Sequence, residues 1–521
     1  MPMVMGGETE YAISARDRHG HVIAQNVLLA QCWEHARQTL GYSSASTRGR
    51  FLRNGGLIYL DAGLHLEWGS PETTSPFEVV RYLAAGDRIV HDIVRAFAAA
   101  SDDVAEIFCS RVNVDYVSET LWAAHESFRF RGDPAELPGQ LVPFLASRVL
   151  FGAGGWDVRS PALRFTLSPR AHFITRLADK DSQFVRPLFH TKDEPLGPSG
   201  DHRLHVACGE SLCSERANVL RFGTTALVVA LVERGVRSGT DLALASPVTA
   251  VQRFAADPAC RATTRLVSGD RLTALDLQRR YLECVEAHLD DLPFPWAREV
   301  CALWRETIDD LASGGSRAAV WLDWAIKRRL FRRCLERRGI RWTALAEWHA
   351  VLAKLTRVWA DGPNDGGAFD LAAALTPTLW LRTEMDRLTP MLERRGLSWD
   401  GLPALALARQ EVFELDARFS ALGEDGIFDG LDRAGALDHR VRDLDVADAV
   451  LNPPQDTRAR VRGDVVRRLS EAGTAYGAEW TGVYDRDRNR ELVLMNPLTS
   501  EECWRDLPAR SKSDPFPITR A

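Results

Sequence analysis

The sequence has few features of a membrane-spanning or secreted protein. It contains no stretch that approaches the roughly 18 uninterrupted apolar residues of a membrane span. Residues 1–7 show no basic segment followed by a long apolar run. The nine cysteines are scattered, and none forms the CxxC pair of a zinc or redox site. We therefore expect reduced thiols, a cytoplasmic location and no membrane partner.

Several common catalytic signatures are missing too. The chain has no GxxxxGK[ST] phosphate loop, no GxSxG nucleophile turn and no HExxH zinc motif. It also lacks an excess of positive charge, since its formal net charge is -6 over 521 residues. This negative net charge argues against a protein whose main role is to bind the phosphate backbone of nucleic acids. A P-loop ATPase and a nucleic-acid partner are both disfavoured.

What is present is typical of a folded protein with two domains. The hydrophobic fraction is 45% and the charged fraction 26%, and a domain usually takes about 100–200 residues. We expect a catalytic domain over 1–440, with a helical insertion at about 341–404, and a small α/β domain over 441–521. The expected elements are a strand in 1–20 ending at a Gly20 turn, helices at 22–40, 79–98 and 214–232, a polar linker at 41–49, a strand or bent strand pair at 57–70, strands near 162–167 and 203–207, and a flexible loop at 361–367. The basic segment 321–338 is typical of a solvated helix face.

The segment 57–70 is the most informative for chemistry. Strand side chains alternate between faces, which places Leu60, Ala62, Leu64, Leu66 and Trp68 on one face and Tyr59, Asp61, Gly63, His65, Glu67 and Gly69 on the other. Glu8 and Glu10 share a face of the first strand, and Arg203 and His205 share a face of a later one. Each pair alone is read as a solvated strand face. Together they supply the oxygen ligands that Mg²⁺ prefers, so the sequence predicts an ATP and Mg²⁺ platform on a sheet.

Short segments resemble the Pup-ligase and depupylase family, in the same order along the chain. Residues 6–11 (GGETEY) are similar to the family's opening G-x-E-T-E-[YF]. The other segments are 51–55 (FLRNG), 59–61 (YLD), 65–70 (HLEWGS), 124–128 (AHESF), 167–171 (LSPRA), 191–195 (TKDEP), 203–206 (RLHV), 223–228 (GTTALV) and 453–458 (PPQDTR). Agreement over both expected domains is more specific than any single motif.

The resemblance implies an α+β fold of the glutamine-synthetase-like superfamily, with a curved antiparallel sheet packed with helices and a small C-terminal α/β domain. It implies Asp61 as the catalytic aspartate, which would accept a proton from the incoming amine. The expected metal ligands are Glu8, Tyr59 and Glu67, to which ligand chemistry adds Glu10, Glu126 and His205. The expected nucleotide-binding residues are Ser70, Trp480 and Arg170, and the expected substrate-binding residues are Lys192, Arg203 and Arg458.

Some positions depart from the family pattern. Leu57 stands where the family has a nucleotide-contacting arginine, and Leu196 replaces a histidine. Pro169 replaces glutamine, His190 replaces asparagine, and Lys192 replaces arginine. Because lysine lacks the two-pronged donor geometry of arginine, handling of phosphate or carboxylate groups is expected to differ.

The leading functional hypothesis is an ATP-dependent ligase that joins the C-terminal glutamate of a Pup-like modifier to a lysine amine through an acyl phosphate. Hydrolysis of that bond, as in the depupylases, is a second hypothesis, although the short linker at 41–49 favours the ligase branch. A third is a ligase for an amino acid or peptide and a small amine. A fourth is a non-catalytic binding protein.

Overall fold

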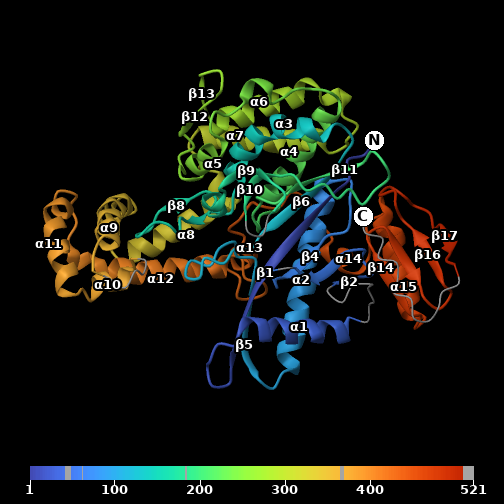
Figure 1. Cartoon of the computed structure of the whole chain (residues 1–521), viewed down its shortest axis with the longest axis horizontal. Helices are drawn as coiled ribbons and strands as arrows, with labels where there is room; N and C mark the ends of the chain where they lie inside the picture. The colour runs from blue at the N-terminus through green and yellow to red at the C-terminus, as the bar shows by residue number, and fades with distance from the viewer. Residues whose placement is uncertain (41–48, 62, 182–184, 364–368, 509–521) are drawn as a thin grey trace.

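The computed structural model describes residues 1–40, 49–61, 63–181, 185–363 and 369–508. Its centre is a seven-stranded antiparallel sheet in the order β11-β6-β1-β4-β3-β2, with β5 also paired to β1 (Figure 1). The strands are β1 (Met5–Asp17), β2 (Gly49–Phe51), β3 (Leu57–Leu60), β4 (Leu66–Gly69), β5 (Val104–Ser110), β6 (Ala124–Phe130) and β11 (His202–Val206). The predicted α+β class is confirmed.

Two helices from the predicted set pack against this sheet. α2 (Pro76–Ala100) begins after Ser75, whose hydroxyl accepts a hydrogen bond from Phe77 N, and proline suits the first helical turn. α4 (Glu215–Glu233) begins at Ser214, which caps Ala217 N, and Gly235 follows it with φ +77°. Both predicted helices are confirmed, as is α1 (Gln25–Thr39).

The predicted segment 57–70 is a strand pair joined by a tight turn. Trp68 on β4 is buried against α2, where its indole Nε1 donates to Tyr82 O at 3.0 Å. The prediction that Leu64 belongs to a buried apolar face is wrong. Leu64 lies in the turn with φ +63° and is 53% exposed. Strict alternation stops at the turn because the chain reverses there. Ala62 and the linker residues 41–48 lie outside the described residues.

Helices and short strands surround the sheet. They are α3 (Leu137–Ser147), α5 (Pro247–Ala255), α6 (Ala274–Ala287), α7 (Ala297–Ala312), α13 (Ile427–Arg433), β7 (Gly155–Trp156), β8 (Phe165–Thr166), β9 (Arg176–Asp179), β10 (Pro187–His190), β12 (Thr263–Arg265) and β13 (Arg271–Thr273). The strand expected near 162–167 is the two-residue β8, and the one expected at 203–207 is β11. Among the described residues, no helix is both long and apolar enough to cross a membrane.

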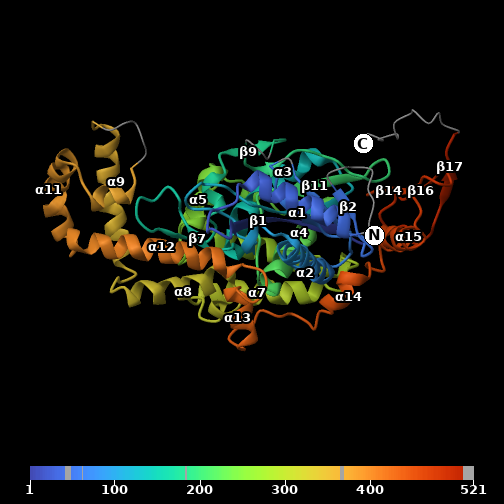
Figure 2. The same cartoon turned by 90° about the horizontal axis from the view of Figure 1, so that it is seen from below.

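A helical arm extends from one end of the molecule. It comprises α8 (Asp323–Arg337), α9 (Ala344–Ala360), α10 (Leu371–Leu375), α11 (Leu379–Glu393) and α12 (Leu402–Phe419). Both views place α9 and α11 at the far end of the arm, away from the main sheet (Figures 1 and 2). The expected helices of 341–404 are therefore present, while residues 364–367 of the expected loop at 361–367 lie outside the described residues.

The expectation of a solvated basic helix is wrong for Lys327 on α8. Its ammonium is buried, forms an ion pair with Asp416 of α12 at 2.7 Å and donates to Gly154 O at 3.1 Å. Arg332 and Arg337 on the same helix are exposed. The difference arises because one side of α8 packs on α12, which supplies the compensating carboxylate.

The C-terminal residues form a second unit with its own sheet. It contains α14 (Val446–Leu451), α15 (Arg458–Glu471) and the antiparallel strands β14 (Tyr476–Glu479), β15 (Gly482–Asp485), β16 (Arg490–Val493) and β17 (Trp504–Asp506). Its apolar cluster includes Val465 and Leu492, and Phe51 of β2 packs into it. We call residues 446–508 the C-terminal unit. The domain boundary at 441 stays a prediction.

Candidate active site

Strand register brings acidic and imidazole side chains to one face of the main sheet. On β1, Glu8 lies opposite His125 of β6, and Glu10 lies opposite Glu67 of β4. On the neighbouring strand β3, Tyr59 also lies opposite Glu67. These side chains line a cavity of about 870 Å³, which we call the main cavity. Residues distant in the sequence are thus gathered by cross-strand pairing.

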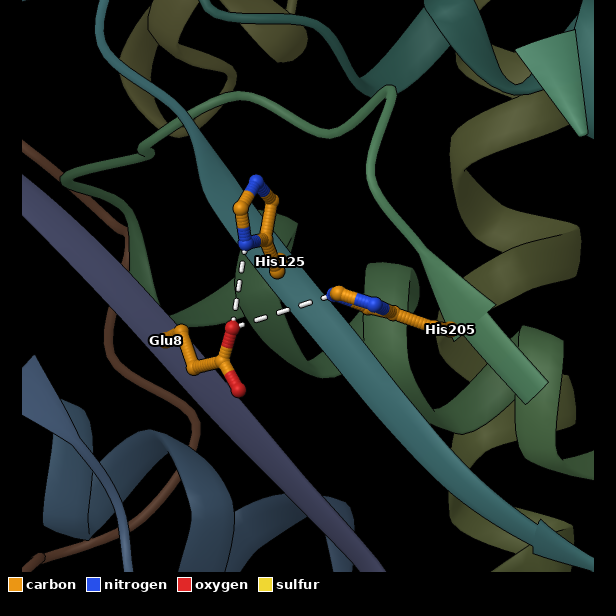
Figure 3. A group of neighbouring side chains, drawn as sticks. All are labelled: Glu8, His125 and His205. Atoms are coloured by element: carbon orange, nitrogen blue, oxygen red, sulfur yellow. Dashed lines mark hydrogen bonds and ion pairs between the residues drawn. The ribbon is translucent and has the colours of Figure 1, made fainter. Parts of the chain in front are cut away.

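Glu8 is the centre of one potential metal-binding group. His125 Nδ1 lies 3.0 Å from Glu8 Oε2, and His205 Nε2 lies 3.8 Å from the same oxygen (Figure 3). His125 is also 4.0 Å from carboxylate oxygens of Glu10 and Glu67, which makes a second group. We call Glu8, Glu10, Glu67, His125 and His205 the carboxylate–histidine group.

Glu67 carries the clearest sign that a cation belongs here. Its side chain is only 3% exposed, and its Oε1 has no hydrogen-bond partner within the described part of the chain. Burial and the charges of Glu8 and Glu10 raise its pKa well above the usual value. Burial also opposes ionisation of Glu8, but His125, Arg203 and His205 outweigh it and lower the pKa of Glu8. Crowded carboxylates with an unsatisfied oxygen fit a hard divalent cation such as Mg²⁺.

Asp61 lies at the edge of this group, in the turn after β3. Its Oδ1 accepts a hydrogen bond from His65 N at 2.6 Å, and its Oδ2 lies 3.4 Å from His65 Nδ1. Burial opposes its ionisation, but the contacts with His65 lower the pKa of Asp61 below the usual value. Burial likewise disfavours charged His65, yet hydrogen bonds with Asp61 and Glu10 raise the pKa of His65 to about 9. Asp61 is therefore an ionised, partly accessible carboxylate.

Ser70 and Trp480 lie at a second, smaller pocket of about 130 Å³. It shares Glu8 and Trp480 with the main cavity. Ser70 Oγ accepts from Gly7 N at 3.0 Å and donates to Pro71 O at 3.0 Å, so the hydroxyl is held in place. Gly6 and Gly69 also line this pocket, and a Cβ at Gly69 would stand 3.5 Å from Trp480 Cζ2. We call it the Ser70–Trp480 pocket.

The predicted basic residues divide between the two cavities. Arg170 is buried in the wall of the main cavity, where it donates to Trp122 O at 2.7 Å and burial lowers its pKa. Lys192 lines the same cavity and pairs with Glu194 at 2.8 Å. Arg203 lines the Ser70–Trp480 pocket and contacts Glu8 at 3.0 Å.

One predicted residue lies elsewhere than expected. The structure does not bring Glu126 to the carboxylate–histidine group, because its side chain is on the opposite face of β6 and accepts two 2.7 Å hydrogen bonds from Arg148. Arg458 lines the Ser70–Trp480 pocket, where its guanidinium donates a hydrogen bond to Glu72. The other predicted residues lie at one of the two cavities.

The sequence-based site omits several side chains that the structure places there. His125 is the most important, and its cross-strand position opposite Glu8 was not visible in the sequence. His65, Lys180, Arg186 and His190 also line the main cavity. A strand assignment over 124–128 would have placed His125 and Glu126 on opposite faces, but it could not say which face carries the site.

Comparisons with known proteins identify relatives of this chain. The family model described as Pup-ligase protein matches residues 3–372 and 385–484, and the gap between them lies inside the insertion predicted at 341–404. A Pup–protein ligase of Rhodococcus erythropolis is 28% identical over 94% of this chain and 95% of its own length. A Pup–protein ligase of Mycobacterium bovis is 28% identical, again over 94% and 95%.

Two solved structures share the fold. The crystal structure of the complex between the prokaryotic ubiquitin-like protein Pup and its ligase PafA aligns with a TM-score of 0.74 and 21% identity, over 96% of this chain and 90% of that one. The structure of PafA in complex with ADP aligns with a TM-score of 0.69 and 21% identity, over 92% of each chain. Since the family model spans most of the sequence, the chain belongs to the Pup-ligase family.

Proposed function

We propose that the protein is an ATP-dependent ligase that joins the C-terminal glutamate of a Pup-like modifier to a lysine amine. The observation that carries this proposal is the position of the Asp61 carboxylate, which is held by His65 at the edge of the carboxylate–histidine group. Its relatives are Pup–protein ligases, and the fold is that of a ligase solved with Pup and with ADP.

The Ser70–Trp480 pocket is the expected place for the nucleotide base. Trp480 offers an aromatic surface at this pocket, on which a flat ring can stack. Glu8 lines both cavities, so phosphates that extend from this pocket reach the carboxylate–histidine group. Arg170, Lys180 and Lys192 add positive charge to the main cavity, which suits an anionic modifier end as well as phosphate.

The carboxylate–histidine group, with Tyr59, would hold Mg²⁺. When bound there, Mg²⁺ would neutralise the negative charge that shifts between phosphate oxygens during transfer. Glu67 supplies the oxygen that lacks another partner in the described residues, and Glu8 stays ionised beside His125. Because Glu126 faces away from the cavity, it is not part of this proposed ligand set.

The reaction takes place in two displacements. An oxygen of the modifier's γ-carboxylate attacks the terminal phosphorus of ATP, and ADP leaves, which gives an acyl phosphate. The lysine nitrogen then attacks the carbonyl carbon, the C–N bond forms and inorganic phosphate leaves. A lysine ammonium has no lone pair for this attack, so Asp61 first accepts its proton. The hydrogen bond from His65 N holds the Asp61 carboxylate in position for this step.

Hydrolysis by a depupylase would use water in place of the amine. The relatives found here are named for ligation, which supports the ligase over its hydrolytic sister. Ligation to a small amine uses the same two displacements and differs only in the acceptor. An assay with both a lysine-bearing protein and free lysine separates these acceptors.

The test is ATP turnover with Mg²⁺ and a glutamate-terminated Pup-like peptide, with adducts detected by intact mass. We expect the peptide to stimulate ATP consumption and an amide-linked adduct to form. Asp61→Asn should slow adduct formation by about 10²–10⁴-fold, the usual contribution of a positioned base. Asp92→Asn, at an exposed carboxylate on α2, is the matched control and should retain activity.

Either of two results would contradict the proposal. One is adduct formation by Asp61→Asn at the rate of the unaltered protein. The other is nucleotide binding without any response to the peptide, which would retain the family's fold but remove the modifier as the substrate. Release of the peptide from a conjugate without ATP would point to the hydrolase instead.

A further inference from the structure

Three charged side chains are buried where the C-terminal unit meets the connection after β4. Arg458 and Arg462 of α15 are 4% and 0% exposed, and both bind the carboxylate of Glu72. Arg458 Nε donates to Glu72 Oε1 at 2.7 Å, and Arg462 Nη2 donates to Oε2 at 2.6 Å. Glu72 and Arg458 also line the Ser70–Trp480 pocket. We call these three residues the Glu72 cluster.

Arg462 connects this cluster to Trp480. Its Nη1 donates to Trp480 O at 3.0 Å, and its guanidinium carbon lies 4.8 Å from the centroid of the Trp480 ring. The same guanidinium lies 5.0 Å from the centroid of Phe51 and donates to Gly55 O at 2.7 Å. Phe51 and Gly55 belong to the β2–β3 part of the main sheet. Arg462 therefore holds Trp480 relative to the main sheet through backbone and ring contacts.

Arg458 extends the cluster to a second loop. Its Nη1 donates to Leu196 O at 2.7 Å and to Leu494 O at 2.9 Å. Leu196 lies in the connection between β10 and β11, four residues after Lys192 of the main cavity. The cluster thus contacts the β4 connection, the β10–β11 connection and the C-terminal unit at once.

The charge balance of the cluster is unusual for a purely structural contact. Two guanidiniums share one carboxylate, so the cluster carries one net positive charge beside the pocket. Removing ions from water costs several kcal/mol for each ion, and apolar side chains of similar size often pack as stably.

From these contacts we infer that the Glu72 cluster is a positioning device for the nucleotide site. Glu72 holds Arg462 in place, and Arg462 holds the Trp480 ring over the pocket. Binding of a nucleoside diphosphate or triphosphate is thereby coupled to docking of the C-terminal unit on the main sheet. This inference rests on the proposed use of the Ser70–Trp480 pocket for ATP. Coupling of this kind is reciprocal, so the nucleotide should also stabilise the docked unit.

The experiment measures ADP affinity by calorimetry with Mg²⁺, on the full chain and on two variants of the cluster. Glu72→Gln removes the charge and keeps the shape, and we expect it to weaken ADP binding by about tenfold or more. Arg462→Lys keeps the charge but loses the second donor arm, and it should weaken binding by a smaller factor. ADP should also raise the thermal unfolding temperature of these variants by less than it raises that of the unaltered protein.

The matched control is Asp416→Asn in the helical arm. Asp416 is a buried carboxylate that pairs with Lys327 at 2.7 Å and accepts a hydrogen bond from Tyr116, so its loss breaks a comparable contact. We expect it to lower the unfolding temperature without changing ADP affinity. A loss of affinity in the cluster variants beyond that of this control separates positioning from general destabilisation.

Equal ADP affinity in Glu72→Gln and the unaltered protein overturns the inference and leaves the proposed function standing. No ADP binding by the unaltered protein overturns both. If Glu72→Gln does not fold, ADP affinity is measured on Glu72→Asp instead. This variant keeps the negative charge but moves it away from Arg462 by the length of one methylene group. Weaker ADP binding by Glu72→Asp supports the coupling, and unchanged binding overturns it.

Discussion

His125 and Glu126 are neighbours on β6 with opposite surroundings. The imidazole of His125 lies in the main cavity, 3.0 Å from Glu8. The carboxylate of Glu126 is fully buried on the other face, where Arg148 donates to both of its oxygens. Because side chains of a strand alternate, one step along β6 separates the candidate metal site from the core.

Substitutions at these two positions should affect different properties. We expect His125→Ala to weaken Mn²⁺ binding by roughly tenfold or more, since loss of a neighbouring partner commonly costs 10–100-fold in metal affinity. Glu126→Gln should leave metal affinity unchanged and lower the free energy of unfolding by about 3–5 kcal/mol, because it leaves Arg148 buried without its partner charge. Electron paramagnetic resonance of bound Mn²⁺ and denaturant unfolding measure the two effects. Equal loss of Mn²⁺ binding in both variants would contradict the assignment of faces.

At the scale of elements, the site depends on how closely α2 approaches β4. Gly86 of α2 lies under the Trp68 indole, and a Cβ there would stand 2.1 Å from Trp68 Cδ1. Trp68 is followed by Gly69 and Ser70, and preceded by Glu67. A side chain at position 86 would therefore displace the strand that carries Glu67 of the carboxylate–histidine group and leads into the Ser70–Trp480 pocket.

Gly86→Ala should destabilise the protein although alanine favours helices. Alanine is more favourable than glycine inside a helix by about 1 kcal/mol of folding free energy. Forcing an extra methyl group into a packed core costs about 1–3 kcal/mol and occasionally more. Trp68 and its neighbours are fully buried, so we expect a net loss in thermal unfolding temperature together with weaker ADP binding. Gly139→Ala in α3 is the control, because nothing lies within 4 Å of its added Cβ. A Gly86→Ala protein as stable as this control would show that α2 can move away from β4 at little cost.

At the scale of the whole molecule, the Glu72 cluster joins the C-terminal unit to the main sheet. Burial opposes ionisation of Glu72, but Arg462 and Arg458 outweigh it and lower its pKa from 4.5 to about 2. A group whose pKa is lowered by folding stabilises the folded state above its unfolded pKa, and that contribution disappears as the pH falls through the folded pKa. The contact is therefore fully stabilising above about pH 4.5 and lost towards pH 2.

Acid titration of stability tests this contact. The free energy of unfolding of the unaltered protein should exceed that of Glu72→Gln by about 3 kcal/mol at neutral pH, the value expected from this difference in pKa. The excess should shrink between pH 4.5 and 2. Denaturant unfolding at several pH values measures both curves, with Asp92→Asn as the surface control. A constant difference across this pH range would show that Glu72 contributes through packing rather than charge.

The sequence by itself determined the local chemistry of this protein. Strand alternation placed Tyr59 and Glu67 on one face, local patterns predicted the helices at 79–98 and 214–232, and the order of motifs indicated the family. These features depend on residues close together in the chain, where backbone geometry sets which side chains share a face. The α+β class was implied by the resemblance to the family.

Only the tertiary structure decided which of these residues meet. The register between β1 and β6 brought His125, rather than Glu126, to Glu8, and the packing of α8 on α12 buried Lys327. The docking of α15 against Glu72 placed Arg458 at the Ser70–Trp480 pocket. Such contacts join positions tens to hundreds of residues apart, and their strand register and helix packing are set by burial of the whole core rather than by any local pattern.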